Sequence, residues 1–154
     1  RSFYRFLTYD DLYRLGDRLH RLYEDFERME DMVVAWSNKT PVQALSAYFN
    51  GINGIPDYDK GSACKRLCMF LRWMVRRNSP VDMGVWRKVS PDSLIVPLDT
   101  HVHRMALELG LTSRKQADMR TAVEITNAMR EVFPNDPARG DFALFGYGVE
   151  HKNK

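Results

Sequence analysis

The sequence predicts an all-α fold, a compact helical domain with one long irregular connection. Three observations predict it. Apolar residues recur at three- and four-residue spacing, helix-capping residues stand at the starts of these stretches, and no stretch alternates apolar and polar residues for long. The 154 residues, of which 44% are hydrophobic and 28% charged, suffice for one globular domain with its own core. We therefore expect a single helical domain over residues 1–154.

The first half of the chain contains two clear helix starts. Thr8, followed by two aspartates, predicts the first, and leucines then repeat at helical spacing. Thr40 predicts the second, because threonine caps a helix and the proline after it is favoured at the first helical position. Residues 50–59 are rich in glycine and asparagine, which predicts a loop, and residues 61–77 then show a strong helical pattern.

The second half begins with the irregular connection. Three prolines and a glycine interrupt residues 78–97, so we expect short turns there and no long helix. Asp99 is expected to cap the next helix, and Gly110 to end it in a left-handed conformation. Two more helical patterns cover residues 119–133 and residues 137–147.

Cysteine content and hydropathy limit the class of protein. Cys64 and Cys68 are the two cysteines, which is too few for a disulfide framework or for a zinc or iron–sulfur site. We expect reduced thiols, no metal and no cofactor. No apolar run approaches the ~20 residues that span a bilayer, and no secretory leader is visible. The chain begins at Arg1 and not at methionine, which suggests a processed chain or a piece of a longer one.

Basic residues gather on the strongest predicted helix. From Lys60 to Val81 there are six of them and no acidic residue. At about 100° per residue, three point within about 20° of one direction, opposite an apolar face: Lys65, Arg72 and Arg76. Such a stripe is either a solvated surface or an anion-binding surface, where a phosphate would offset the repulsion between the arginines. A basic amphipathic helix can also lie on a membrane surface, but we expect no membrane partner here, because the apolar face is needed for the core.

Lys65 stands at the N-terminal end of this stripe. The positive end of the helix and the neighbouring Arg66 both disfavour its ammonium form, and a neutral lysine is a nucleophile. The alternative is an ordinary solvated lysine. The helix pattern alone leaves both open.

The segment I-V-P-L-D-T-H-V-H-R at residues 95–104 is the most informative. An apolar approach ends in Pro97, and Asp99 then begins a helix that apolar residues anchor in the core. Asp99 is thus a helix cap held on rigid elements, and capping does not exclude catalysis. His101 and His103 point about 200° apart on a helix, so they do not share a metal ion. We expect one of them to be packed or hydrogen-bonded in the core.

Residues 98–104, L-D-T-H-V-H-R, resemble the V-D-T-H-V-x-R signature of the helix-hairpin-helix DNA glycosylases, which include endonuclease III and the 8-oxoguanine glycosylases. In that superfamily the aspartate is essential for catalysis, which implies this role for Asp99. Residues 65–72, K-R-L-C-M-F-L-R, resemble the helix that carries the nucleophilic lysine of the archaeal 8-oxoguanine glycosylases. Asp99 follows Lys65 by 34 positions (99 − 65), a separation similar to that of the archaeal type.

The chain also resembles an uncharacterised bacterial family related to these enzymes. The likeness lies in F-L-R-W-M-V-R at 70–76, P-L-D-T-H-V at 97–102, D-P at 136–137 and D-F-A-L-F-G at 141–146. Members of that family are longer at the N-terminus, which implies that this chain is the C-terminal portion of a longer protein. Two features depart from the glycosylases: the loop at 53–59 lacks the L-P-G-V-G spacing of the hairpin, and there is no four-cysteine cluster motif.

The resemblance implies base-excision repair of double-stranded DNA with a damaged base, with oxidised purines as the expected lesion, in a cytoplasmic, nucleoid-associated protein. Lys65 would attack the sugar C1′, and Asp99 would stabilise the developing positive charge or assist proton transfer. The Schiff base that results would permit strand cleavage. Two alternatives remain open: a non-catalytic DNA-binding module of the same fold, and a helical domain that binds an acidic protein.

Basic and aromatic residues complete the predicted site. The residues expected to contact DNA are Lys60, Arg66, Arg72, Arg76 and Arg104. The aromatic residues considered for stacking on an extruded base are Trp73, Trp86 and Phe145, each with a place in the hydrophobic core as its alternative.

Overall fold

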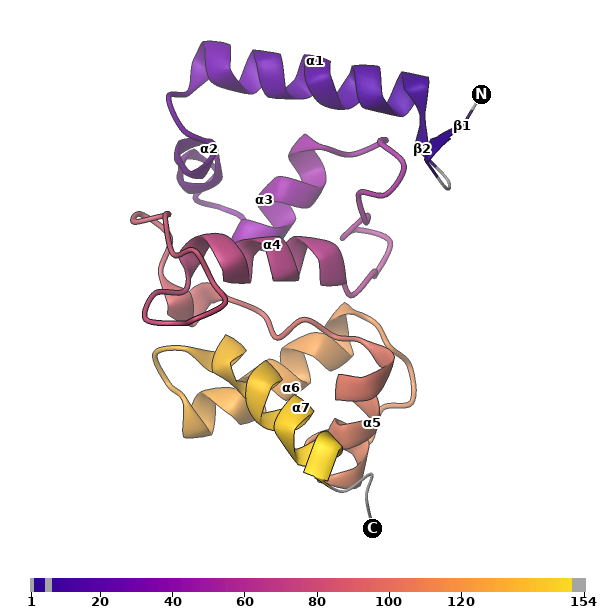
Figure 1. The fold of residues 1–154 in the computed structure, drawn as a ribbon, viewed down its shortest axis with the longest axis vertical. Coiled ribbons are helices and arrows are strands. Elements are labelled where there is room, and N and C mark those ends of the chain that lie inside the picture. The colour runs from indigo at the N-terminus through magenta and orange to yellow at the C-terminus, as the bar shows by residue number, and fades with distance from the viewer. Residues whose placement is uncertain (1, 5–6, 151–154) are drawn as a thin grey trace.

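The computed structural model of the protein describes residues 2–4 and 7–150. These residues are mostly helical, which confirms the all-α class (Figure 1). The α-helices in chain order are α1 (Tyr9–Asp25), α2 (Met29–Ala35), α3 (Pro41–Tyr48), α4 (Lys65–Val75), α5 (Thr100–Glu108), α6 (Met119–Val132) and α7 (Gly140–Glu150). The short elements are the 3₁₀ turns η1 (Pro91–Ser93) and η2 (Pro137–Arg139) and the antiparallel strands β1 (Ser2–Tyr4) and β2 (Leu7–Thr8). Within the described part of the chain, no helix is both long and apolar enough to cross a bilayer.

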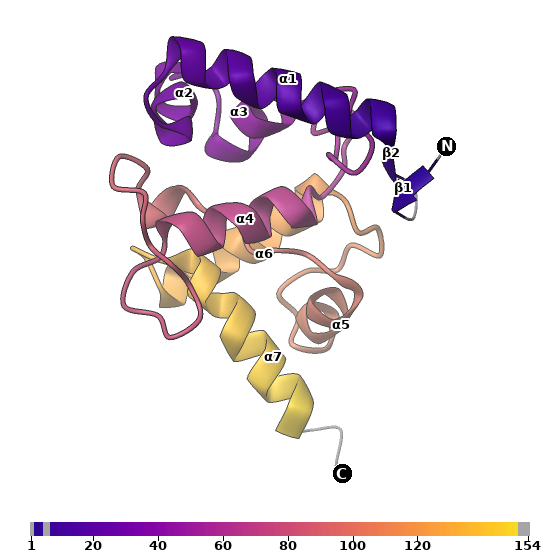
Figure 2. The same cartoon turned by 45° about the horizontal axis from the view of Figure 1, so that its top comes forward.

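Helix α4 occupies the middle of the molecule. In Figures 1 and 2 it lies between a group formed by α1, α2 and α3 and a group formed by α5, α6 and α7. The irregular connection after α4 carries the chain from the first group to the second. Both ends of α4 are therefore positioned by segments that are distant in the sequence.

The predicted helix starts are confirmed at atomic detail. The Thr8 hydroxyl accepts a hydrogen bond from the Asp11 amide at 3.1 Å, and the Asp11 carboxylate accepts one from the Thr8 amide at 2.9 Å. Thr40 and Gln43 form the same reciprocal pair at the start of α3. These capping boxes satisfy amides that have no partner within the helix, so each start is fixed locally by the sequence.

The predicted end of α5 is also confirmed. Gly110 has a φ of 68°, and its amide donates to the carbonyl of Leu107 at 3.2 Å. The amide of Leu111 donates to the carbonyl of Ala106 at 2.8 Å. This pair of bonds is a Schellman motif, which needs the left-handed conformation that glycine adopts without strain.

Three elements differ from the predictions. Helix α4 begins at Lys65 and not near residue 61, because Cys64 adopts a left-handed conformation with a φ of 49°. The short helix α2 and the β1–β2 pair were not predicted, since each is too short to show a period in the sequence. The connection after α4 agrees with the prediction, because it contains no α-helix. The amides of Met83 and Gly84 both donate to the carbonyl of Trp73, which ties the connection to α4.

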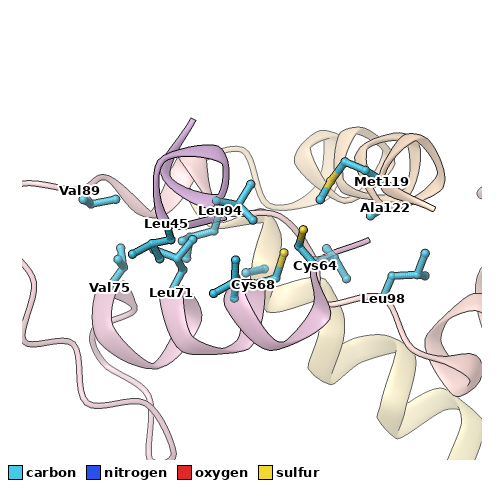
Figure 3. Close-up of a cluster of buried hydrophobic side chains, with 14 of the residues drawn as sticks. Leu45, Cys64, Cys68, Leu71, Val75, Val89, Leu94, Leu98, Met119 and Ala122 are labelled. Carbon is cyan, nitrogen blue, oxygen red and sulfur yellow. The ribbon is translucent and has the colours of Figure 1, made fainter. Parts of the chain in front are cut away.

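The core is built on the apolar face of α4. Figure 3 shows Cys68, Leu71 and Val75 of this helix beside Leu45 of α3 and Leu94 of the connection. The two cysteines are buried free thiols, and burial raises the pKa of the Cys68 thiol to about 12. Their packing holds α4, and hence the Lys65 end of it, rigidly between the two groups of helices.

Candidate active site

The structure brings Lys65 and Asp99 together. Lys65 is the first residue of α4, Asp99 precedes the first residue of α5, and the Lys65 Nζ lies 3.2 Å from the Asp99 Oδ2. The side chains are 49% and 37% exposed, so both are accessible from solvent. The amine and the carboxylate selected from the sequence thus form one ion pair at a surface cavity.

Asp99 is held by two interactions, one on each carboxylate oxygen. Its Oδ1 accepts a hydrogen bond from the Val102 amide at 2.8 Å, which makes it the N-cap of α5 as predicted. Its Oδ2 faces Lys65. Leu98 beside it is buried in the core, so the backbone that carries the carboxylate is fixed. A carboxylate oriented in this way presents its negative charge at a set position.

The cavity around this pair has a volume of about 340 Å³. This Lys65–Asp99 cavity has apolar walls from Met69, Pro97 and Phe145, and it also contains Asp141. A few charged groups on an apolar lining are typical of sites that bind small organic groups.

Asp141 is a functional candidate that the sequence analysis missed. It lies in the first turn of α7, lines the cavity, and pairs with Arg72. Burial raises the pKa of Asp141, and the negative charge of Asp99 adds to the effect, although Arg72 opposes both. The signal in the sequence was the aspartate of the D-F-A-L-F-G segment, but a single aspartate with an unknown distant partner cannot be placed in a site.

The pKa of Asp99 moves in the opposite direction. Burial alone would raise it, but the hydrogen bond from the Val102 amide and the nearby Lys65 ammonium together hold it below its ordinary value. One cavity therefore contains a carboxylate, Asp99, whose pKa is lowered and another, Asp141, whose pKa is raised. Such a division is typical of sites in which one group remains charged and another transfers a proton.

The opposite shifts predict opposite pH dependences of stability. Folding raises the pKa of Asp141, so its contribution to the free energy of unfolding is fully present below its ordinary value of 3.8 and is lost as the pH rises through the higher native value. Folding lowers the pKa of Asp99, so its contribution is present above 3.8 and is lost as the pH falls through the lower native value.

Urea unfolding at a series of pH values measures this difference. We expect the advantage of the wild type over Asp141→Asn to shrink as the pH rises above the ordinary carboxyl range. The advantage over Asp99→Asn should shrink as the pH falls below that range. Parallel profiles for the two variants would contradict the assigned directions.

The two histidines of α5 have different surroundings. His103 is buried, and its Nε2 lies 2.7 Å from the carbonyl oxygen of Arg114, which confirms that one of the pair is fixed in the core. The His101 ring packs edge-on against Phe145 at the cavity, with the ring centroids 5.6 Å apart. Gly148 of α7 faces the same ring, and a Cβ at this position would come within 2.5 Å of it. The absence of a side chain there lets α7 close on α5 and shape the cavity.

The prediction that Arg72 and Arg76 face solvent and hold phosphates is wrong. Both guanidiniums are buried around the fully buried carboxylate of Asp82, with an Arg72 Nε–Oδ1 distance of 3.2 Å and an Arg76 Nη1–Oδ2 distance of 2.5 Å. Arg72 also pairs with Asp141, and Arg76 pairs with Asp136 at 2.9 Å. The stripe is basic within its own helix, but carboxylates from other segments cover and neutralise these two charges.

The other basic residues remain at the surface, and their role in DNA binding stays a prediction. Lys60 is exposed and lies 3.4 Å from Asp57. Arg66 is exposed and donates from its Nη1 to a backbone carbonyl of the preceding loop. Arg104 is exposed, with its Nε 3.8 Å from Glu108. Exposed pairs of this kind are weak, so a phosphate can compete for these side chains.

The aromatic candidates separate into three different environments. Trp86 is buried and packs edge-on against Phe70, with ring centroids 5.7 Å apart, so its assignment to a base pocket is wrong. Trp73 is 40% exposed and does not line the Lys65–Asp99 cavity. Phe145 is 60% exposed and does line it. Phe142, which the sequence analysis missed, forms another wall of the cavity.

The sequence matches, over residues 1–150, the family described as "Protein of unknown function (DUF2400)". The chain belongs to this family. No curated protein and no solved structure matches it. In this DUF2400 protein, the matched region includes every residue of the Lys65–Asp99 cavity.

Proposed function

We propose that this DUF2400 protein is a DNA base-excision glycosylase with abasic-site lyase activity. The observation that carries the proposal is the 3.2 Å approach of the Lys65 amine to the Asp99 carboxylate at a cavity. The order of elements supports it: α3, a loop, α4 beginning at the lysine, an irregular connection, and a helix capped by the aspartate. The helix-hairpin-helix glycosylase fold implied by the resemblance belongs to the same proposal.

The chemistry follows from the charges around the amine. Lys65 must lose its ammonium proton before it can attack, and because its side chain is 49% exposed, solvent at the cavity can take that proton. The amine then forms a bond to the sugar C1′ while the bond from C1′ to the base breaks, and the base leaves with the electron pair. Asp99, whose lowered pKa keeps it ionised, stabilises the positive charge that develops on the sugar. The nitrogen then loses a proton, a C1′=N bond forms as the bond from C1′ to the ring oxygen breaks, and the ring oxygen takes up a proton. The resulting Schiff base permits β-elimination.

Asp141 is suited to the departing base. Its raised pKa means that it takes up a proton more readily than an ordinary aspartate, and in that form it can donate a hydrogen bond or a proton to the base as it leaves. Phe145 and Met69 offer apolar contact to an extruded ring. Double-stranded DNA with an oxidised purine is the proposed substrate, and a cytoplasmic, nucleoid-associated location is proposed with it. The exposed basic residues Lys60, Arg66 and Arg104 would contact phosphates.

Borohydride trapping tests the proposal directly. A duplex with one oxidised purine or one abasic site is mixed with the full natural chain and reduced, and the products are separated by denaturing electrophoresis. We expect a covalent protein–DNA complex with the wild type and none with Lys65→Gln, because reduction fixes only a Schiff base. The control variant Lys39→Gln removes an exposed cation outside the cavity and outside the proposed DNA contacts, and it should still be trapped.

The alternative functions give different results in the same experiment. Salt-dependent DNA binding by the wild type, with no trapped complex on either substrate, would overturn the glycosylase proposal and favour a non-catalytic DNA-binding module. No salt dependence and no trapping would favour a domain that binds an acidic protein.

A further inference from the structure

A second hollow lies at the C-terminal end of α4. It has a volume of about 540 Å³ and is formed where the chain leaves α4 and where η2 leads into α7. Phe142 forms a wall both of this hollow and of the Lys65–Asp99 cavity. The cations at its rim are Arg77 and Arg139, so we refer to it as the Arg77–Arg139 hollow.

These two arginines differ from the buried arginines of α4. Arg77 is exposed, and its Nη2 donates to the backbone carbonyls of Trp86 at 3.2 Å and Arg87 at 3.4 Å. Arg139 is exposed, and its guanidinium lies 5.4 Å from the centre of the Phe133 ring. Among the residues that the structure describes, neither has a carboxylate partner.

The acid in this hollow is already neutralised. Asp136 is the acidic residue of the lining, and both of its carboxylate oxygens accept hydrogen bonds from the Nε of Arg76 at 2.9 Å. The charges of Arg77 and Arg139 are therefore uncompensated, and the hollow is a site for an anion.

Both guanidiniums are held before any ligand arrives. The carbonyl bonds of Arg77 use its Nη2 and leave its Nε and Nη1 for a ligand, while the Phe133 ring positions Arg139. The polypeptide under them is also fixed, because Asn78 takes a left-handed turn with a φ of 57° and the buried Asp82 anchors the loop. Preorganised arginine forks match the planar, bidentate geometry of phosphate oxygens at a reduced entropic cost.

We propose that the Arg77–Arg139 hollow binds a backbone phosphate of DNA. The inference rests on the proposed function only for the choice of DNA as the source of the phosphate. Helix α4 runs from Lys65 to Val75, about 15 Å at 1.5 Å per residue, and Arg77 follows two residues beyond its end. The length of the helix corresponds to about four or five base-pair steps of 3.4 Å. A strand whose nucleotide enters the Lys65–Asp99 cavity can thus place a phosphate a few nucleotides away in this hollow.

The surface of α4 between the two sites supports a continuous contact. Met69 and Trp73 follow Lys65 at four-residue intervals within α4, so these three side chains form one slowly turning stripe of the helix that leads towards its C-terminal end. Trp73 is 40% exposed and belongs to neither site. An exposed indole between two cationic sites can pack against a sugar or a base of the same strand.

Salt-dependent binding of an undamaged duplex tests the phosphate site. We expect the double variant Arg77→Gln/Arg139→Gln to bind more weakly and to reduce the magnitude of the log K against log salt slope by about 0.9, the value for one phosphate contact. Glutamine at position 77 keeps an N–H donor for the carbonyls of Trp86 and Arg87, so the loop after α4 should keep its conformation. The matched control, Arg18→Gln/Lys39→Gln, removes the same charge from exposed residues in the α1–α3 group and should leave the slope nearly unchanged.

Replacing single phosphates by neutral methylphosphonates locates the contact. The duplex contains one abasic-site analogue. We expect one neutral linkage within about five steps of that analogue to weaken binding by the wild type but not binding by the double variant. An unchanged slope together with an unchanged pattern of sensitive linkages in the double variant would overturn the inference. So would a salt slope near zero for the wild type, which would favour an acidic protein as the partner.

The two proposals fail separately. If Lys65 traps no DNA but the double variant loses one phosphate contact, the glycosylase proposal falls and the phosphate site remains. If the protein is trapped normally but the double variant binds and is trapped like the wild type, the phosphate site falls and the glycosylase proposal remains.

Discussion

Replacement of Asp82 by alanine should lower the free energy of unfolding by about 3–5 kcal/mol, the typical cost of removing one partner from a buried ion pair. The Asp82 carboxylate is fully buried and accepts from Arg72 and Arg76, which are also buried. Its loss leaves two guanidiniums that have been removed from water and share fewer acceptors. Because the free energy of unfolding of a domain is only about 5–15 kcal/mol, this single change should remove a large part of it.

Urea unfolding of Asp82→Ala and of the wild type at neutral pH measures this loss. Asp92→Ala is the matched control, because Asp92 is an exposed aspartate of the same connection, and its replacement should change the free energy by no more than about 0.5 kcal/mol. A loss below about 1 kcal/mol for Asp82→Ala would mean that Asp136 and Asp141 alone satisfy the two arginines.

Replacement of Asp99 by asparagine should preserve the fold and reduce the proposed base-excision activity by about 10²–10³-fold, the range for removal of one preorganised electrostatic group. Asparagine caps helices as well as aspartate does, so the bond from the Val102 amide should persist, and the melting temperature should fall only by the small contribution of the partly exposed ion pair with Lys65. The negative charge beside Lys65 disappears, and with it the stabilisation of the sugar cation. Single-turnover excision and thermal unfolding measure the two effects.

Asp118 supplies the control for this variant. It caps α6 in the same geometry, with its Oδ1 accepting from the Thr121 amide at 2.9 Å, and it pairs with Arg114. Asp118→Asn should therefore match Asp99→Asn in stability and retain the wild-type rate. An excision rate for Asp99→Asn within about threefold of the wild type would refute the role of this carboxylate.

Local features of the fold could be predicted from the sequence because their causes are local. Thr8, Thr40 and Asp99 each bond to an amide three residues ahead, so the start of each helix is determined within one turn. Gly110 ends its helix for an equally local reason. The helix α2 has only seven residues, and the Arg28 side chain makes no cap bond. The sequence therefore contains neither a long apolar period nor a capping side chain from which this helix could be predicted.

The candidate site was only partly predictable, because burial depends on segments far away in the sequence. Helical periodicity placed Arg72 and Arg76 on a polar face, but it could not show that Asp82 and Asp141 cover that face, the latter 69 residues from Arg72. The same limit concealed Asp141 as a site residue. Lys65 and Asp99 were selected through motifs that resemble a known superfamily, and the periodic pattern alone did not distinguish them from a solvated lysine and an ordinary cap.

The buried charges also determine how rigid the molecule is between its two candidate sites. Carboxylates and guanidiniums alternate in an unbroken series from Asp141 in the Lys65–Asp99 cavity, through Arg72, Asp82 and Arg76, to Asp136 in the Arg77–Arg139 hollow. Neither end can shift without separating an ion pair inside the protein, so the interval between the sites is constant. A duplex that occupied both would have to match that interval, and any bending needed to do so would cost about 1–6 kcal/mol, depending on its base sequence, and least at flexible or damaged steps.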